Sequence, residues 1–189
     1  TGSTNFDLIL LNSQSINFGT IFAMVFILVG LAFKVSAVPF HMWTPDVYQG
    51  SPTTVTTFFS VVPKIAGIGI LIKFMYIPFQ GVMDQWQNIL VFISIASMIL
   101  GAVAAIGQNN IKRLIAYSSI GHIGYAIAGI AAGTENGFQN TILYITIYAV
   151  MNIGAFAFIL SMKRGQKYIE EIDELSGASK NHPLKSFGL

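Results

Sequence analysis

Lysine side chains stand inside long apolar stretches of this sequence, where ionisable residues are rare. Lys64 lies eleven residues after Thr53, in an apolar stretch that ends near Ile77, so it should lie close to the bilayer midplane. Burial penalises the charged form of a lysine, which makes a switch between charged and neutral amine available there. Pro63, directly before Lys64, removes a helical hydrogen bond and loosens the backbone. The pattern favours a lysine that carries protons over one that only packs.

A second lysine, Lys34, lies nine residues before Trp43, a residue type that favours the membrane interface. One interpretation is that the helix ends near Phe33 and that the long Lys34 side chain reaches the interface. The alternative is functional, because Pro39 should kink or break the helix just past Lys34. His41 would then follow two turns beyond Lys34 on the same face if the helix continued. Broken helices with ionisable groups beside the break recur at transport sites.

His122 is the third candidate for proton chemistry at membrane depth. It lies ten residues into the stretch that starts at Lys112, and Ser118 precedes it by one turn on the same face. Histidine titrates nearest neutral pH, although a histidine here could equally be a packing contact with another helix. On charge pattern alone, Lys112 and Arg113 are typical topology anchors at a helix start.

Other polar residues at membrane depth have less specific interpretations. Lys73 lies near the end of its stretch, on the helix face opposite Lys64, and is expected to be an interface anchor. A polar stripe at four-residue spacing would line a hydrated path or contact another helix; it consists of Tyr144, Tyr148 and Asn152. The sequence has no cysteine, no metal-ligand spacing, no phosphate-binding loop and no nucleophile beside a base. We therefore expect a proton relay, with no cofactor or metal bound by this chain.

Five apolar stretches must position these residues, each near the roughly 20 residues that a helix needs to cross a hydrocarbon core. The 189 residues are 53% hydrophobic and 10% charged, which is too apolar for a soluble domain of this size. Backbone amides cannot stay unpaired in lipid, and nothing in the pattern alternates as in a membrane barrel. We predict an all-α integral membrane bundle of about five helices, one of them broken, at residues 16–43, 53–77, 86–107, 112–132 and 138–162.

The basic residues gather at one end of such a bundle if successive helices alternate in direction: Lys112, Arg113, Lys163, Arg164 and Lys167. This end should be cytoplasmic, and the first helix should start outside. Beyond Met162, four apolar residues at helical spacing predict a short amphipathic helix on the cytoplasmic surface or on a partner: Tyr168, Ile169, Ile172 and Leu175. We expect residues 163–189 to form this segment and the start of a further helix. The absence of an initial methionine suggests a fragment of a longer protein.

Two long motifs are specific enough to compare with known families. One runs from Phe33 to Thr53 and contains Trp-Thr-Pro-Asp-Val-Tyr at residues 43–48. The other, from Asn110 to Tyr125, is Asn-Ile-Lys-Arg-Leu-Ile-Ala-Tyr-Ser-Ser-Ile-Gly-His-Ile-Gly-Tyr. In this order they resemble the antiporter-like membrane subunits of respiratory complex I, in the branch called subunit N, or subunit 2 in mitochondria. The resemblance covers nearly the whole chain.

The resemblance implies a subunit that pumps protons while partner subunits transfer electrons from NADH to quinone. It implies two inverted repeats of five helices, each with one broken helix, of which this chain matches the seventh to eleventh helices. Lys34 would be the broken-helix lysine and Lys64 the central lysine, with His41, Lys112 and His122 on the connecting polar path. The glutamate of the fifth helix and the lysine of the twelfth would lie outside this chain.

The resemblance also sets the expected partners and cofactors. The chain would adjoin other antiporter-like and small membrane subunits in a bacterial plasma membrane or an organelle inner membrane. Flavin, iron–sulfur clusters, NADH and quinone would belong to partner subunits, and a net charge of +2 gives no indication of nucleic acid. The main alternative is a Mrp-type cation/proton antiporter subunit or a hydrogenase membrane subunit. The Trp-Thr-Pro-Asp motif that starts at Trp43 argues against the antiporter. A structural scaffold of internal ion pairs would need carboxylates, and the predicted spans contain none.

Overall fold

The computed structural model describes residues 4–13, 18–164 and 167–177. In these ranges the α-helices are α1 (Phe6–Ser13), α2 (Phe18–Val35), α3 (Trp43–Gly50), α4 (Thr53–Tyr76), α5 (Met83–Ile106), α6 (Ile111–Ala131) and α7 (Glu135–Ser161). A 3-10 turn, η1 (Gln80–Val82), leads into α5. Five helices are long and apolar enough to cross a membrane: α2, η1 with α5, α4, α6 and α7. The predicted all-α membrane fold with one broken helix is thus confirmed.

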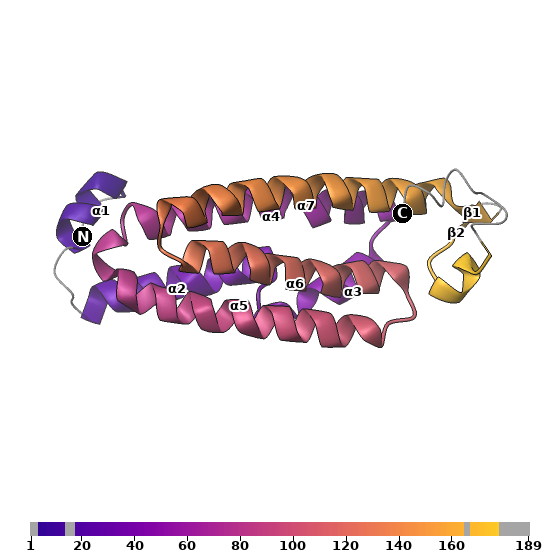
Figure 1. The fold of residues 1–189 in the computed structure, drawn as a ribbon, viewed down its shortest axis with the longest axis horizontal. Coiled ribbons are helices and arrows are strands. Elements are labelled where there is room, and N and C mark those ends of the chain that lie inside the picture. The colour runs from indigo at the N-terminus through magenta and orange to yellow at the C-terminus, as the bar shows by residue number, and fades with distance from the viewer. Residues whose placement is uncertain (1–3, 14–17, 165–166, 178–189) are drawn as a thin grey trace.

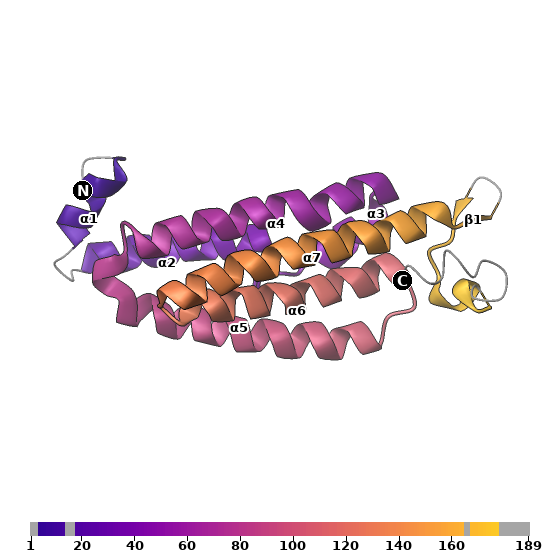
Figure 2. The same cartoon turned by 45° about the horizontal axis from the view of Figure 1, so that its top comes forward.

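The helices run along the length of an elongated bundle, with α1 at one end and the segment after α7 at the other (Figures 1 and 2). We call the end that holds the start of α6 and the segment after α7 the basic end, after Lys112 and Arg113. The opposite end holds α1 and the links α4–α5 and α6–α7. Helix α5 lies alongside α6, and α4 alongside α7.

The first predicted span is in fact two helices, since α2 ends at Val35 and α3 begins only at Trp43. Ser36 has a left-handed backbone with φ 69°. Around it the Ala37 amide donates to the Ala32 carbonyl at 2.8 Å and the Ser36 amide to the Phe33 carbonyl at 3.1 Å, a helix-ending motif. The break just past Lys34 is therefore confirmed, but it precedes Pro39.

The side chains around the break hold the link between α2 and α3 in place. The Trp43 indole donates to the Phe33 carbonyl at 3.0 Å, so a free carbonyl at the end of α2 finds a partner. Thr44 donates to the Ser36 hydroxyl at 2.6 Å, and the Val38 amide donates to Ser97 of α5 at 2.9 Å. The peptide bond after Val38 is cis.

Glycines allow α5 and α6 to pack backbone against backbone. A Cβ atom at Gly101 would lie 2.5 Å from the Gly121 nitrogen and 2.8 Å from the Tyr117 carbonyl. At Gly124 a Cβ would lie 2.9 Å from the Ser94 carbonyl, while the Ser94 hydroxyl donates to the Gly124 carbonyl at 2.8 Å. Small residues at such crossings are the usual means of joining helices in a membrane, where lipid gives no hydrophobic drive.

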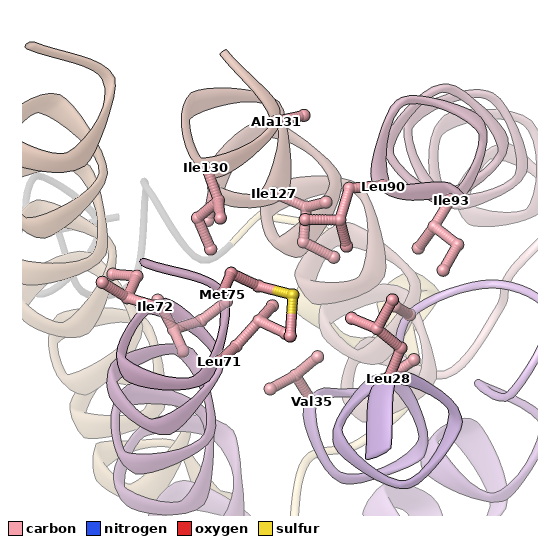
Figure 3. Packing of buried hydrophobic residues seen from close by; sticks show 14 of the residues in the cluster. Leu28, Val35, Leu71, Ile72, Met75, Leu90, Ile93, Ile127, Ile130 and Ala131 are labelled. Carbon is pink, nitrogen blue, oxygen red and sulfur yellow. The ribbon is translucent and has the colours of Figure 1, made fainter. Parts of the chain in front are cut away.

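The hydrophobic core fills the half of the bundle away from the basic end. Figure 3 shows side chains from four helices in it: Leu28, Val35, Leu71, Ile72, Met75, Leu90, Ile93, Ile127, Ile130 and Ala131. Along α4, the buried residues after Lys64 are apolar or glycine, while Thr53, Thr56 and Ser60 are buried before it. Along α4, Lys64 therefore lies at the boundary between buried hydroxyl residues and buried apolar ones.

The predicted amphipathic helix after Met162 is wrong. The described residues form a short antiparallel pair, β1 (Lys163–Arg164) with β2 (Lys167–Tyr168), and a 3-10 turn η2 (Ile172–Leu175). Three of its apolar residues, Ile169, Ile172 and Leu175, do pack against the end of α7 and the start of α6. The Glu170 carbonyl accepts from the Ile111 amide, and the Ile172 amide donates to the Asn109 carbonyl. A helix pairs its backbone groups internally and would not leave them available for these bonds. The predicted further helix, from Lys185, lies outside the described residues.

Candidate functional site

Lys64 lies at the middle of α4, with 1% of its surface exposed. Its ammonium donates to the hydroxyl of Ser119 on α6 and lies 5.5 Å from the centre of the Tyr48 ring of α3. Within the described ranges no carboxylate pairs with it. A hydroxyl and an aromatic face are therefore the groups that contact this buried ammonium.

Ser119 connects Lys64 to a third helix. The Tyr148 hydroxyl, at the midpoint of α7, lies 3.0 Å from the Ser119 hydroxyl and 3.0 Å from the Ser60 carbonyl of α4. Ser119 and Tyr148 are 1% and 2% exposed. Since a hydroxyl both donates and accepts, the series Lys64–Ser119–Tyr148 offers a chain of groups through which a proton can be exchanged.

His122 lies beside this chain, one turn after Ser119 on α6. Its Nδ1 is 2.6 Å from the Tyr144 hydroxyl, and its ring centre is 5.4 Å from that of Tyr148. On another side His122 lines a cavity of about 430 Å³ between α5 and α6, together with Ser118 and Tyr125. The predicted shared face of Ser118 and His122 thus exists, and it faces this cavity.

The polar stripe of α7 was predicted either to line a hydrated path or to contact another helix. Tyr144 and Tyr148 contact the His122 and Ser119 side chains of α6, whereas Asn152 donates to the Tyr148 carbonyl one turn earlier at 3.0 Å. The stripe is therefore a contact between helices that also supplies two hydroxyls to the site.

Lys112 and Arg113, at the start of α6, have carboxylate partners that the sequence analysis did not assign. The Lys112 ammonium is 2.8 Å from Glu170 Oε1 and donates to the Ser51 carbonyl at 3.1 Å. Arg113 pairs with Asp46 at 2.5 Å. Asp46 lies between the first two predicted spans, where the structure forms α3, and it meets Arg113 at the basic end.

Lys34 and His41 do not join the polar chain. Lys34 is exposed in the last turn of α2 and lines a cavity of about 300 Å³ with Trp43 and Pro63. His41 is half-buried in the link, and since α2 ends at Val35, its expected place two turns along the same helix face is wrong. In the part of the chain that the structure describes, no hydrogen bond connects either residue to Lys64.

Lys73 is exposed in the last turn of α4, at the end of the bundle opposite the basic end. Its ammonium lies 5.2 Å from the centre of the Phe6 ring of α1. This place agrees with the predicted interface anchor. Among the described residues, no group of three or more His, Asp or Glu side chains is placed to hold a metal ion.

Sequence reasoning located Lys64 but not its partners. Which hydroxyl meets Lys64 depends on how far α6 and α7 are shifted along α4, and no local pattern encodes that shift. The sequence pattern favoured Ser118, the residue directly before Ser119. It gave Tyr148 only as one of the three residues in the polar stripe of α7. Glu170 was overlooked because the tail was treated as a separate surface helix.

The chain resembles known proteins over nearly its whole length. The chain is 61% identical to NADH-quinone oxidoreductase subunit N of Pelagibacter ubique, over 100% of this chain and 40% of the relative. It matches a solved respiratory complex I from Thermus thermophilus with 31% identity and a TM-score of 0.73, over 94% of this chain and 38% of that chain. A Mrp complex from Dietzia sp. DQ12-45-1b, 23% identical over 98% of this chain and 34% of that chain, shares the fold with a TM-score of 0.88.

The chain spans about 40% of the length of these curated relatives. The family model for the NADH:quinone oxidoreductase/Mrp antiporter transmembrane region matches residues 1–189, and the chain belongs to this family of multi-pass membrane proteins.

Proposed function

We propose that this chain is part of a proton-translocating membrane subunit of an NADH:quinone oxidoreductase, of the subunit N type. The observation that carries the proposal is the buried chain Lys64–Ser119–Tyr148 at mid-depth in the bundle. Similarity to curated subunit N relatives at 61% and 53% identity supports the choice of reaction. The subunit acts as a translocase, while the electron transfer itself takes place in partner subunits.

In this proposal Lys64 holds the transported proton. Ser119 accepts it from the ammonium and can pass on its own hydroxyl proton, and Tyr148 and the pair His122–Tyr144 extend the route across the bundle. Since the buried residues of α4 beyond Lys64 are apolar or glycine, we place the exchange with solvent at the basic end, on the side of Lys112. A route closed on one side is what prevents protons from leaking across.

Lys34 and His41 have a second role in the proposal. Lys34, at the break between α2 and α3, loads and releases a proton at the neighbouring cavity, and a carboxylate elsewhere in the full protein tunes its affinity. His41 in the link belongs to the same path. Flavin, iron–sulfur clusters, NADH and quinone are held by partner subunits, and other membrane subunits adjoin this one. The membrane is a bacterial plasma membrane or an organelle inner membrane, with the basic end in the cytoplasm or matrix.

Replacing Lys64 with alanine in the full-length subunit within its complex tests the proposal. We expect fewer protons per electron with electron transfer retained, and an unchanged ratio would rule out the role of Lys64. The alternative, a Mrp-type antiporter or hydrogenase subunit, is supported by fold similarity to the Mrp complex and by the family model, which also covers Mrp antiporters. Co-purification separates the two, because a subunit of the oxidoreductase should be isolated together with flavin and iron–sulfur subunits.

A further inference from the structure

The ion pair at the start of α6 is unlike an ordinary helix anchor. Only 3% of the Lys112 side chain is exposed, compared with 34% for its partner Glu170. The ammonium lies between Glu170 Oε1 at 2.8 Å and the Ser51 carbonyl at 3.1 Å. A topology anchor would extend into water, whereas Lys112 is turned into the protein and held by two oxygens.

The segment that carries Glu170 is fixed to the start of α6 by its backbone. We call residues 168–175 the tail segment. The Ile111 amide donates to the Glu170 carbonyl at 2.8 Å, and the Ile172 amide donates to the Asn109 carbonyl at 2.8 Å. Ile169, Ile172 and Leu175 pack on an apolar cluster of α6 and α7. The position of the Glu170 carboxylate therefore depends on whether the tail segment is docked.

Lys112 lies on the way from the basic end to Lys64. It precedes Ser119 by seven residues, which is two turns on the same face of α6, or about 10 Å along the axis. Ser51 lies in the link into α4, the helix that carries Lys64. Of the other charged groups nearby, Arg113 pairs with Asp46, and Glu171 accepts from the Asn110 side-chain amide at 3.4 Å. In the described part of the chain, Glu170 is the carboxylate that faces Lys112.

We propose that Glu170 is a positioning residue for the relay, holding the Lys112 ammonium at its basic end only while the tail segment is docked. The idea rests on the proposed function. A buried ammonium without a partner is costly, so without the carboxylate the Lys112 side chain turns out to water and leaves the face of α6 that carries Ser119. Docking and undocking of the tail segment then connect and disconnect the basic end.

The test uses the full-length subunit within its complex, with Glu170→Gln and Asp173→Asn as a matched control. Asp173 is exposed in the same segment, so the control makes the same charge change without the contact to Lys112. We expect Glu170→Gln to lower the number of protons per electron to the level of Lys112→Gln, and Asp173→Asn to leave it unchanged. Glu170→Asp, which keeps the carboxylate, should recover at least half of the loss.

The double variant Lys112→Gln/Glu170→Gln removes both charges and so carries the test if Glu170→Gln does not assemble. We expect it to assemble and to pump like Lys112→Gln alone. A further loss, a failure of the double variant to assemble, or a normal ratio in an assembled Glu170→Gln complex would overturn the inference.

Hydrogen exchange separates this inference from the proposed function. Because the ion pair of Glu170 with Lys112 also ties the tail segment to α6, the amides of Ile111 and Ile172 should exchange at least tenfold faster in Glu170→Gln, whatever ion the subunit moves. Unchanged exchange would overturn the positioning role and leave the role of Lys64 intact. Faster exchange together with normal pumping in Lys64→Ala would instead remove the proposed function and leave the docking.

Discussion

The Lys64 ammonium and the Ser119 hydroxyl meet at the centre of the bundle, although 55 residues separate them in the chain. Ser119 is in turn 3.0 Å from the Tyr148 hydroxyl, so one small side chain on α6 connects the lysine of α4 to the tyrosine of α7. The account of a proton relay depends on this three-helix contact more than on the lysine alone.

Removal of the Ser119 hydroxyl should interrupt the relay at its centre. In Ser119→Ala the buried Lys64 ammonium loses its acceptor, and an unsatisfied buried donor costs about 1–3 kcal/mol. We expect proton pumping to fall while electron transfer continues, measured as protons per electron in the assembled complex. Ser118→Ala, on the neighbouring face of α6, is the control and should pump normally. Equal pumping by the two variants would show that Ser119 is not part of the route.

The Tyr148 hydroxyl should matter for both pumping and stability. Tyr148→Phe keeps the ring but loses the contacts to Ser119 and the Ser60 carbonyl, at a cost of about 1 kcal/mol. Thermal unfolding of the purified subunit in detergent measures the stability, and vesicle acidification measures the pumping. Tyr125→Phe removes a hydroxyl from an exposed tyrosine of α6 and should change neither. A Tyr148→Phe subunit with native pumping would limit the route to Lys64 and Ser119.

The close approach of α5 and α6 predicts opposite effects for two similar glycine substitutions. Gly101→Ala places a methyl group against the Gly121 backbone and should destabilise the subunit by about 1–3 kcal/mol. Gly69→Ala on α4 meets nothing within 4 Å and should stabilise the helix by up to about 1 kcal/mol. Unfolding midpoints in detergent should therefore move in opposite directions. Shifts of the same sign would contradict the backbone packing described for α5 and α6.

The two ion pairs of the basic end should differ in strength because their burial differs. Asp46 is 74% exposed, so Asp46→Asn should cost less than about 1 kcal/mol despite the short contact to Arg113. Glu170→Gln removes the charge partner of the largely buried Lys112 ammonium, whose side chain then turns out to water, and should cost about 2–3 kcal/mol, less than the loss of a fully buried pair. The same detergent unfolding experiment compares them, and a larger loss in Asp46→Asn would reverse the assignment of the stronger pair.

The sequence was sufficient where composition and helix length decide the outcome. The count of residues from Thr53 placed Lys64 at mid-depth, and four of the five predicted spans match helices to within a few residues. The sequence also placed the break after Lys34, but the prediction attributed the break to Pro39. Ser36 ends α2 through a left-handed backbone that serine rarely adopts, so its sequence carries no such signal.

The remaining differences come from contacts between segments that are distant in sequence. The residues from Tyr168 to Leu175 have helical spacing, yet backbone bonds to Asn109 and Ile111 hold the part before η2 extended. Those bonds, and the meeting of Glu170 with Lys112, depend on where α7 ends relative to the start of α6. A pattern within one segment cannot show this, which is why the tail was expected on the surface and Glu170 was missed.

The most direct measurement of the central claim is the number of protons moved per electron by complexes that carry Lys64→Ala or Lys73→Ala. Both variants remove one lysine from the same helix, but Lys64 is buried in the polar chain and Lys73 is exposed at the helix end. The relay account predicts a reduced ratio for Lys64→Ala and a native ratio for Lys73→Ala, at equal rates of electron transfer. A native ratio in both variants would contradict it.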